Sequence, residues 1–330
     1  MTDVGIAGYG EACTAGSAYM DGFAAGVQAA IGELAPTVMG LDPRETAVVN
    51  ARMDASLGGQ LAAKSPIDIA CWDIKGQAAD VPVSTLLGGG FHESLPVFVA
   101  MSLGPAEDMA AYASRLKRTG YRNYQIKAGD DPDEDSARVR AVLDAVGNWD
   151  FVTCDANGGW TRAEALRMAR ALDGFDVFLE QPCLTVEEIA DVRSRTRLPI
   201  LVCEAVTGVT ALVEIVRQRG ADAINLKPTR VGGITKAVQV RDLAQALGLQ
   251  LVVDEPGAGD IASASMLHLA ASTRPEYLLA TAMTPSSVHV AGETLPAIVQ
   301  GRVPAITTPG LGIIVDESLL GAPLFTIGDD

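Results

Sequence analysis

Four short apolar segments, each followed directly by a charged residue, recur at nearly constant spacing in the middle of this chain. The segments are 151–154, 177–179, 200–203 and 223–226, and the residues that follow them are Asp155, Glu180, Glu204 and Lys227. These charged residues are 25, 24 and 23 residues apart, which is the length of one strand, one helix and two short loops. A parallel β/α array requires such helix-sized connections. Charges at successive strand ends are typical of an active site at the C-terminal mouth of a barrel.

The same rhythm extends on both sides of this stretch. Further apolar strands are predicted at 95–101, 121–127, 250–253 and 276–280, and further helices at 106–118, 132–146 and 259–271. Together with the four central strands the count reaches eight, and an irregular tail takes the place of the last helix. We therefore predict an α/β fold with a TIM-type (β/α)7β barrel over residues 95–308.

Residues 1–94 lack this rhythm. A strand is predicted at 5–11, followed by helices at 21–34, 43–57 and 65–77. The third helix is expected to begin at Ser65-Pro66, an N-cap residue followed by proline at the first helical position. The glycines at 88–90 mark a linker. The pattern predicts a small α+β domain over residues 1–94, and a C-terminal tail, 309–330, that returns to it.

The composition limits the classes of partner. The chain has 330 residues, of which 48% are hydrophobic, so it can bury a large core. Its 25 basic and 41 acidic residues give a net charge of −16, which argues against non-specific binding to nucleic acid or anionic membranes. No apolar run approaches about 18 residues, no signal peptide is visible, and the five cysteines form no C-x-x-C pair. We expect a cytoplasmic protein with reduced thiols.

Two lysines end strands that face each other in a closed eight-stranded barrel. Lys127 ends the second predicted strand and Lys227 ends the sixth. Their ammonium groups are therefore predicted to lie on opposite sides of the mouth. A lysine near a metal or other cations can have its pKa lowered enough to act as a base. Two such lysines permit removal of a proton from one face of a substrate and delivery to the other.

Three carboxylates lie on the arc between the lysines, namely Asp155, Glu180 and Glu204. Without nearby His or Cys-His pairs, such a set suits a hard cation that prefers oxygen ligands, Mg²⁺ before Zn²⁺. Removal of the proton α to a carboxylate makes an enediolate, whose developing charge a divalent cation can stabilise. Asp254, at the end of the seventh strand, either tunes Lys227 electrostatically or caps the next loop.

With these residues in place, the chain resembles the enolase superfamily, in its mandelate racemase and muconate lactonizing enzyme branch. The region 68–90, with Ala70-Cys71-Trp72-Asp73-Ile74-Lys75-Gly76, is similar to the end of the family's capping domain. The base and ligand motifs of the family are matched by Lys127, Asp155-Ala156-Asn157, Glu180-Gln181-Pro182 and Asn225-Leu226-Lys227. Sites of this superfamily pair a Lys or His base with Mg²⁺. The resemblance implies that Lys127 and Lys227 are catalytic and that the three carboxylates hold Mg²⁺.

Within the branch, four motifs are similar to those of enzymes acting on proline-type amino acids, among them hydroxyproline betaine epimerases and cis-3-hydroxyproline dehydratases. The motifs are Gln125-Ile126-Lys127-Ala128-Gly129, Glu180-Gln181-Pro182-Cys183, Val231-Gly232-Gly233-Ile234-Thr235-Lys236-Ala237 and Gly259-Asp260-Ile261. The resemblance implies a substrate of that class.

Four departures from the family pattern bear on the site. The chain starts where the family's second strand would be, so the first strand of the capping domain and the specificity loop after it are expected to be missing. Cys203-Glu204 stands where many relatives carry Asp-Glu, which leaves open whether Cys203 or Glu204 contacts the metal. Gln125 replaces an auxiliary lysine, and Gly257 stands where some relatives have a Trp, which weakens the expectation of an aromatic box for a quaternary ammonium.

Three functions remain open at this point. The favoured one is a Mg²⁺-dependent racemase or epimerase of a proline-type amino acid or betaine, in which Lys127 and Lys227 exchange the α-proton on opposite faces. The second is a dehydratase that forms the same enediolate and then loses a β-hydroxyl, as with cis-3-hydroxyproline. The third is an impaired relative that only binds a ligand, suggested by Cys203 and the short N-terminus. The expected partners are a small carboxylate substrate and, by family analogy, further copies of this chain, with no nucleic acid or membrane.

Overall fold

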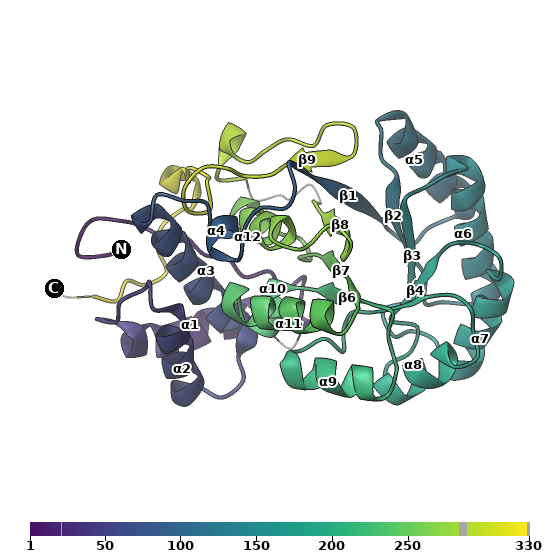
Figure 1. Ribbon diagram of the computed structural model, residues 1–330, viewed down its shortest axis with the longest axis horizontal. Helices are drawn as coiled ribbons and strands as arrows, with labels where there is room; N and C mark the ends of the chain where they lie inside the picture. The colour runs from purple at the N-terminus through teal and green to yellow at the C-terminus, as the bar shows by residue number, and fades with distance from the viewer. Residues whose placement is uncertain (21, 284–288, 329–330) are drawn as a thin grey trace.

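Eight parallel strands close into a barrel at the centre of the molecule (Figure 1). The computed structural model describes residues 1–20, 22–283 and 289–328. The hydrogen-bonded order runs from β2 through β8 to β1, and β1 also pairs with β2, which closes the ring. The strands are β1 Ser94–Met101, β2 Asn123–Lys127, β3 Phe151–Asp155, β4 Phe178–Glu180, β5 Ile200–Val202, β6 Ala223–Leu226, β7 Gln250–Val253 and β8 Leu278–Ala282. The predicted TIM-type fold is thereby confirmed.

Helices form the outer layer of the barrel (Figure 1). They are α5 Ala106–Arg118, α6 Pro132–Val146, α7 Arg162–Ala171, α8 Val186–Arg193, α9 Val209–Arg217, α10 Pro228–Val231, α11 Ile234–Ala246 and α12 Asp260–Ala271. Several begin at strong local signals. The Asp131 side chain accepts hydrogen bonds from the first turn of α6, and Thr161 and Thr185 form capping boxes at α7 and α8.

In the described residues after β8, irregular structure replaces the last helix of the barrel. This part contains the 3₁₀ turns η1 Gly292–Thr294 and η2 Glu317–Leu319 and the short strand β9 Arg302–Pro304, which pairs antiparallel with β1. The chain then returns to the N-terminal section, where Pro82 and Gly310 form a β-bridge and Leu311 N–H donates to Asp73 Oδ1 at 2.9 Å. The proposed domain limits of 1–94, 95–308 and 309–330 stay a prediction.

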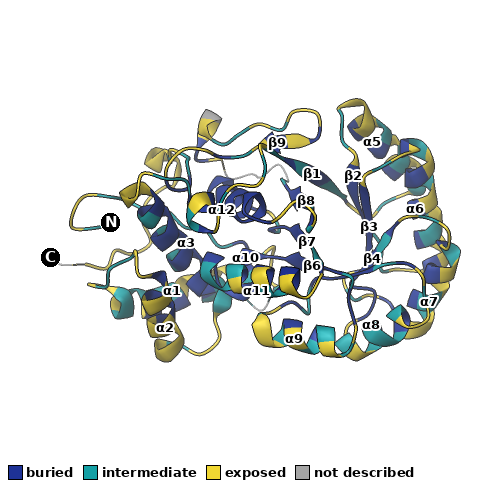
Figure 2. Cartoon of the chain, in the orientation of Figure 1, coloured by how far each residue is buried: buried dark blue, intermediate teal, exposed yellow. Residues whose placement is uncertain are grey.

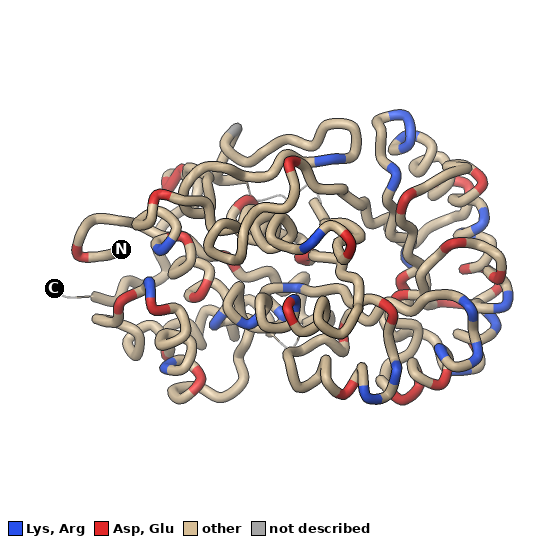
Figure 3. Tube along the Cα trace, in the orientation of Figure 1, with Lys and Arg blue, Asp and Glu red and all other residues tan. Residues whose placement is uncertain are grey.

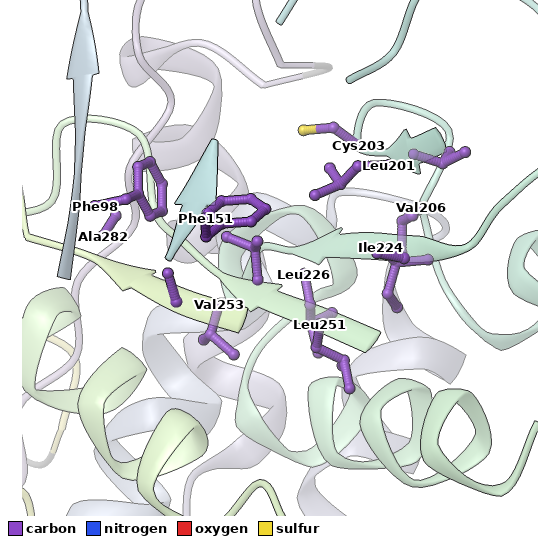
Figure 4. Close-up of a cluster of buried hydrophobic side chains, with 14 of the residues drawn as sticks. Phe98, Phe151, Leu201, Cys203, Val206, Ile224, Leu226, Leu251, Val253 and Ala282 are labelled. Atoms are coloured by element: carbon purple, nitrogen blue, oxygen red, sulfur yellow. The ribbon is translucent and has the colours of Figure 1, made fainter. Parts of the chain in front are cut away.

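The core lies between the strands and their helices (Figure 2). Every residue of β3 and β6 is buried, as expected for parallel strands covered on both faces. The side chains that fill this layer include Phe151 and Phe178, whose ring centroids are 5.4 Å apart. Figure 4 shows part of the same cluster, with Cys203 beside Leu201 at the end of β5. Charged residues lie mostly on the outer helices and loops (Figure 3).

The N-terminal section contains α1 Ala24–Val38, α2 Thr46–Ser56, α3 Leu61–Ala78 and α4 Val83–Leu86. The strand predicted at 5–11 is wrong, because no strand of the described chain pairs with it. The segment instead runs along α3, where Tyr9 N–H donates to Asp73 Oδ2 at 3.1 Å. A Cβ on Gly10 would lie 1.8 Å from the carbonyl oxygen of Pro66, so only glycine permits this approach. The predicted helix start at Asp21 lies outside the described residues.

The predicted start of the third helix at Ser65 is also wrong. Helix α3 begins four residues earlier, at Leu61, after Gln60 adopts a left-handed conformation with φ 49°. The Gln60 carbonyl accepts from the N–H groups of Ala63 and Lys64, so the first turn forms without a side-chain cap. Ser65 and Pro66 lie inside the helix and are buried. Within the described residues, no helix is long and apolar enough to span a membrane.

Candidate active site

The strand order places Lys127 and Lys227 on opposite sides of the barrel mouth. Lys127 is the last residue of β2, and Lys227 directly follows β6. In the closed ring, three strands separate β2 from β6 in either direction. This arrangement agrees with the geometry that the sequence predicts.

A buried polar layer beneath the mouth shows which side chains point inward. The Glu180 carboxylate accepts hydrogen bonds from three strands, from Gln125 Nε2 at 2.9 Å, Thr153 Oγ1 at 3.2 Å and Asn225 Nδ2 at 2.8 Å. Side chains two residues apart on a strand share a face. The residues two positions further along these strands therefore also face the barrel interior, and they are Lys127, Asp155 and Lys227.

Glu180 is the central carboxylate of this layer. It is 1% exposed, and its backbone is in register with Asp155 on the neighbouring strand. Burial, followed by the negative charge of Asp155, raises the pKa of Glu180 to about 7. A cation placed between these two carboxylates would relieve the repulsion.

Lys127 lies on the more open side of the mouth, with 29% of its side chain exposed. Its ammonium donates to Asp155 Oδ2 at 2.5 Å and to Asn157 Oδ1 at 3.1 Å. Burial opposes the charged form of Lys127, but the carboxylates of Asp155 and Glu180 outweigh burial and raise the lysine pKa above its ordinary value. Lys127 is therefore held protonated.

Lys227 lies on the closed side, with 3% of its side chain exposed. Its ammonium pairs with Asp254 Oδ2, which also accepts from Asn225 Nδ2 at 3.4 Å. Burial lowers the pKa of Lys227 below its ordinary value, and the ion pair with Asp254 acts in the opposite direction. Of the two roles considered for Asp254, contact with Lys227 is the one that the geometry favours.

Cys203 and Glu204, the two neighbours at the end of β5, have different surroundings. Cys203 Sγ lies 3.4 Å from an Arg230 guanidinium nitrogen and 3.7 Å from the Tyr19 hydroxyl. Burial raises the pKa of the Cys203 thiol to about 12, so this sulfur is a neutral group facing a cation. Glu204 Oε1 accepts from Asn157 Nδ2 at 2.7 Å, whereas its Oε2 is buried with no partner among the described residues. Of the two, Glu204 is the better candidate for a metal ligand.

The predicted metal ligands fit a hard cation in type and in strand position. Asp155 and Glu180 end β3 and β4, and Glu204 lies two residues beyond β5. All three offer only oxygen atoms, the ligands that Mg²⁺ prefers. The unpartnered Oε2 of Glu204 suits the role of a ligand for such a cation. In the described parts of the chain, however, no three His, Cys, Asp or Glu side chains already form a coordination shell. Lys127 and Asn157 instead hold Asp155 and Glu204.

An N-terminal segment covers the closed side of the mouth. Glu11 accepts from Gly259 N–H at 3.0 Å and Ala262 N–H at 2.9 Å, which caps α12. Further along, Cys13 N–H donates to Thr229 Oγ1 at 3.3 Å. Tyr19 then reaches Cys203, with the Arg230 guanidinium 5.1 Å from its ring centroid. Segment 11–19 therefore spans the ends of β5, β6 and β7.

Several polar residues of the site have no predicted role in the sequence. They are Tyr19, Thr153, Asn157, Arg230 and Glu255, together with the amides of Gln125 and Asn225. For Gln125, Thr153 and Asn225 a usable signal exists, since each lies two residues before a strand-end charge. The positions of Tyr19 and Arg230 depend on long-range packing that no local pattern reports.

Comparisons with known proteins identify the family. Residues 108–319 match the model of the enolase C-terminal domain-like family, and residues 1–88 match the mandelate racemase/muconate lactonizing enzyme N-terminal domain. The chain is 40% identical to a cis-3-hydroxy-L-proline dehydratase of Roseibium aggregatum over 98% of this chain and 88% of that protein. It is 31% identical to an N-succinyl-L-Arg/Lys racemase of Bacillus cereus, over 83% of this chain and 75% of that protein.

The structure is similar to that of a member of the enolase superfamily from Roseovarius nubinhibens ISM in complex with magnesium. The TM-score is 0.92 at 34% identity, with 98% of this chain and 89% of that chain covered. Both matched family domains and the full-length likeness lead to one conclusion: the chain belongs to the enolase superfamily, in its mandelate racemase/muconate lactonizing enzyme branch.

Proposed function

We propose that this chain is a Mg²⁺-dependent enzyme that removes the α-proton of a proline-type amino acid, and that loss of a β-hydroxyl completes the reaction. The observation that carries the proposal is the pair of lysines on opposed strands, one held protonated by Asp155 and the other deeply buried beside Asp254. The likeness to a cis-3-hydroxy-L-proline dehydratase along nearly the whole chain supports dehydration over the other reactions of the family.

The two lysines take different roles in this proposal. Lys227, whose pKa is lowered by burial, accepts the α-proton in its neutral form. Lys127 is kept charged by Asp155 and Glu180, and donates a proton to the departing hydroxyl. The α C–H and β C–O bonds break, a C=C bond forms, and water leaves. Such acid and base groups contribute about 10²- to 10⁴-fold each to a rate.

Asp155, Glu180 and Glu204 would hold Mg²⁺ in this scheme. Bound there, the cation would supply the positive charge that stabilises the substrate carboxylate as it becomes an enediolate. The buried amides of Gln125 and Asn225 and the Thr153 hydroxyl keep Glu180 oriented toward the mouth. Asn157 links the Lys127 ammonium to Glu204 and so joins the acid to the metal site.

Epimerisation is the second candidate, and the opposed positions of the lysines favour it. If the β-carbon carries no hydroxyl, Lys127 can donate its own proton to the α-carbon on the face opposite to Lys227, which keeps the proton that it removed. The likeness to a racemase supports this alternative. The same site would then act as an epimerase on one substrate and a dehydratase on another.

Proton NMR in D₂O tests both candidates, with Mg²⁺ and a panel of proline, hydroxyproline and betaine substrates. We expect α-proton exchange that requires Mg²⁺ and is lost in Lys227→Ala, because Lys227 is the proposed base. Water loss from cis-3-hydroxyproline, giving a cyclic imine, would support dehydration. Deuterium at the α-carbon of inverted substrate without water loss would support epimerisation. Exchange with no member of the panel would contradict the proposal and favour an impaired relative that only binds a ligand.

A further inference from the structure

We propose that Glu255 binds the amine nitrogen of the substrate and so selects amino acids with N–H donors over quaternary betaines and over carboxylates without an amine. This inference rests on the proposed function and names the group that decides substrate class. Glu255 directly follows Asp254, the partner of Lys227, at the end of β7.

Glu255 is a buried carboxylate with one oxygen in a hydrogen bond and the other without a partner among the described residues. The residue is 2% exposed, and its Oε1 accepts from the backbone N–H of Thr229. Its Oε2 is closed to solvent and has no partner in the part of the chain that the structure describes. A buried carboxylate oxygen without a donor is costly, so a ligand that brings an N–H donor there would be bound strongly.

The other carboxylates of the mouth already have hydrogen-bond or ion-pair partners or a proposed role in metal binding. Asp155 pairs with Lys127, Glu180 accepts from three side chains, and Asp254 pairs with Lys227. Glu204 carries the other free oxygen, which the proposed metal site uses. Among the described carboxylates of the mouth, Glu255 is therefore the acceptor left for a cationic group of the substrate.

The position of Glu255 suits the nitrogen of an α-amino acid. Glu255 directly follows Asp254, which pairs with Lys227, and its Oε1 accepts from the N–H of Thr229, two residues after Lys227. These two contacts hold Glu255 close to the proposed base. The amine of an amino acid is one bond from the carbon that Lys227 would deprotonate. Segment 11–19 closes this side, because Cys13 binds Thr229 and Glu11 binds the start of α12. Exclusion of water strengthens a hydrogen bond between ammonium and carboxylate.

The neighbourhood does not suit a quaternary ammonium. A betaine nitrogen carries no N–H to donate to Glu255 Oε2. Gly257, two residues along, has no side chain and adopts φ +67°, and the space beside its Cα is open, so it offers no aromatic face for a methylated cation. The chemistry thus points to an ammonium that carries N–H, which for the proposed proline-type substrate is the secondary ammonium of its ring.

The test compares two ligands that differ in one atom, proline and tetrahydrofuran-2-carboxylate, in which oxygen replaces the ring amine. Both have an α-proton and no β-hydroxyl. With Mg²⁺ present, Glu255→Gln should weaken binding of proline by about 10²-fold, measured by calorimetry, and change binding of the oxygen analogue less than about threefold. The rate of α-proton exchange in D₂O should show the same selective loss.

Glu11→Gln is the matched control, because Glu11 is a second carboxylate at the β7–α12 connection and contacts only backbone N–H groups there. Any effect of this variant should be equal for the two ligands. Equal losses in Glu255→Gln, or no loss, would overturn the inference, as would failure of wild-type protein to bind proline better than the oxygen analogue. Selective binding of proline without exchange would leave the inference standing and contradict the proposed function instead.

Discussion

The two sides of the barrel mouth carry the same residue, lysine paired with aspartate, in opposite surroundings. On the β2–β3 side, Lys127 is 29% exposed and the nearby carboxylates raise its pKa. On the β6–β7 side, Lys227 is 3% exposed under segment 11–19, and burial lowers its pKa. The two lysines thus differ in burial and in neighbouring charge and not in residue type. This difference makes one lysine suited to donate a proton and the other suited to accept it.

The largest expected effect comes from removal of each lysine in turn. Lys227→Met should lower kcat/KM by about 10⁴-fold, because it removes the base, and Lys127→Met by about 10²-fold or more, because it removes the acid. For each variant, kcat/KM is measured both from α-proton exchange in D₂O and from product formation. The comparison between the two sides fails if Lys127→Met is the more damaging variant for exchange, or if either variant retains full activity.

Glu180 accepts hydrogen bonds from both sides of the mouth, from Gln125 on β2 and from Asn225 on β6. Because burial disfavours its charged form, the free energy of unfolding in the absence of Mg²⁺ should fall as pH rises. Its folded-state pKa of about 7 lies above the unfolded value of 4.5, so the folded state binds more protons between these values. The stabilising contribution is full below about pH 4.5 and is lost as pH rises to about 7, by roughly 3 kcal/mol. Urea unfolding across this range checks the slope. Glu180→Gln should make the slope smaller without removing it, because burial also raises the pKa of Glu255 to about 7. An unchanged slope in that variant would contradict the assignment.

The affinity for Mg²⁺ should show whether Glu204 or Cys203 contacts the metal. Glu204→Gln should weaken Mg²⁺ binding about 10- to 100-fold, since it removes a negative oxygen ligand, whereas Cys203→Ser should leave the affinity within about twofold. Calorimetric titration with Mg²⁺ measures both, without any substrate. If Cys203→Ser has the larger effect, the sulfur is the metal contact and Arg230 must release it when the cation binds.

The dependence of kcat/KM on pH should change when the ion pair between Asp254 and Lys227 is removed. Asp254→Asn removes a negative charge next to Lys227, which lowers the lysine pKa further. The rise of kcat/KM that follows loss of the Lys227 proton should then move to lower pH by about one unit. Asp150→Asn, an exposed aspartate paired with Arg122, is the control and should leave the profile in place. A shift to higher pH in Asp254→Asn would contradict this account of Lys227.

The smallest expected effect concerns the cover itself. Glu11→Ala removes a carboxylate that accepts two N–H groups at the start of α12, and should destabilise the protein by about 1 kcal/mol. It should also loosen segment 11–19, which faster amide hydrogen exchange at residues 11–19 would reveal. Unchanged exchange there would mean that Tyr19 and Cys13 hold the segment without Glu11.

Much of the barrel and the strand-end residues could be predicted from the sequence, because both depend on local patterns. Apolar runs, spacing and caps mark the strands and helices, and the two-residue period of a strand fixes which side chains share a face. The positions of Lys127, Asp155, Glu180 and Lys227 follow from these patterns. Their catalytic and metal-binding roles are a proposal that the experiments above test.

The remaining features depend on contacts between distant parts of the chain. The segment at 5–11 has the composition of a strand, but a strand forms only where another strand pairs with it. Ser65-Pro66 resembles a helix start, but the left-handed Gln60 begins α3 earlier. No local pattern around Cys203 predicts that the hydroxyl of Tyr19, 184 positions away, contacts its sulfur. Such contacts are set by tertiary packing and not by local propensity.

The closure of the barrel has a consequence for how the site comes into being during synthesis. Because β1 pairs with β8, the ring cannot be completed until nearly the whole chain has emerged from the ribosome. Segment 11–19 is made first, yet its partners at 203, 229 and 259 are made much later. Until then Lys227 is in water and carries an ordinary ammonium charge. A nascent or truncated chain that lacks β8 therefore has the residues of the proposed base and acid, but not the difference between them that the proposed chemistry requires.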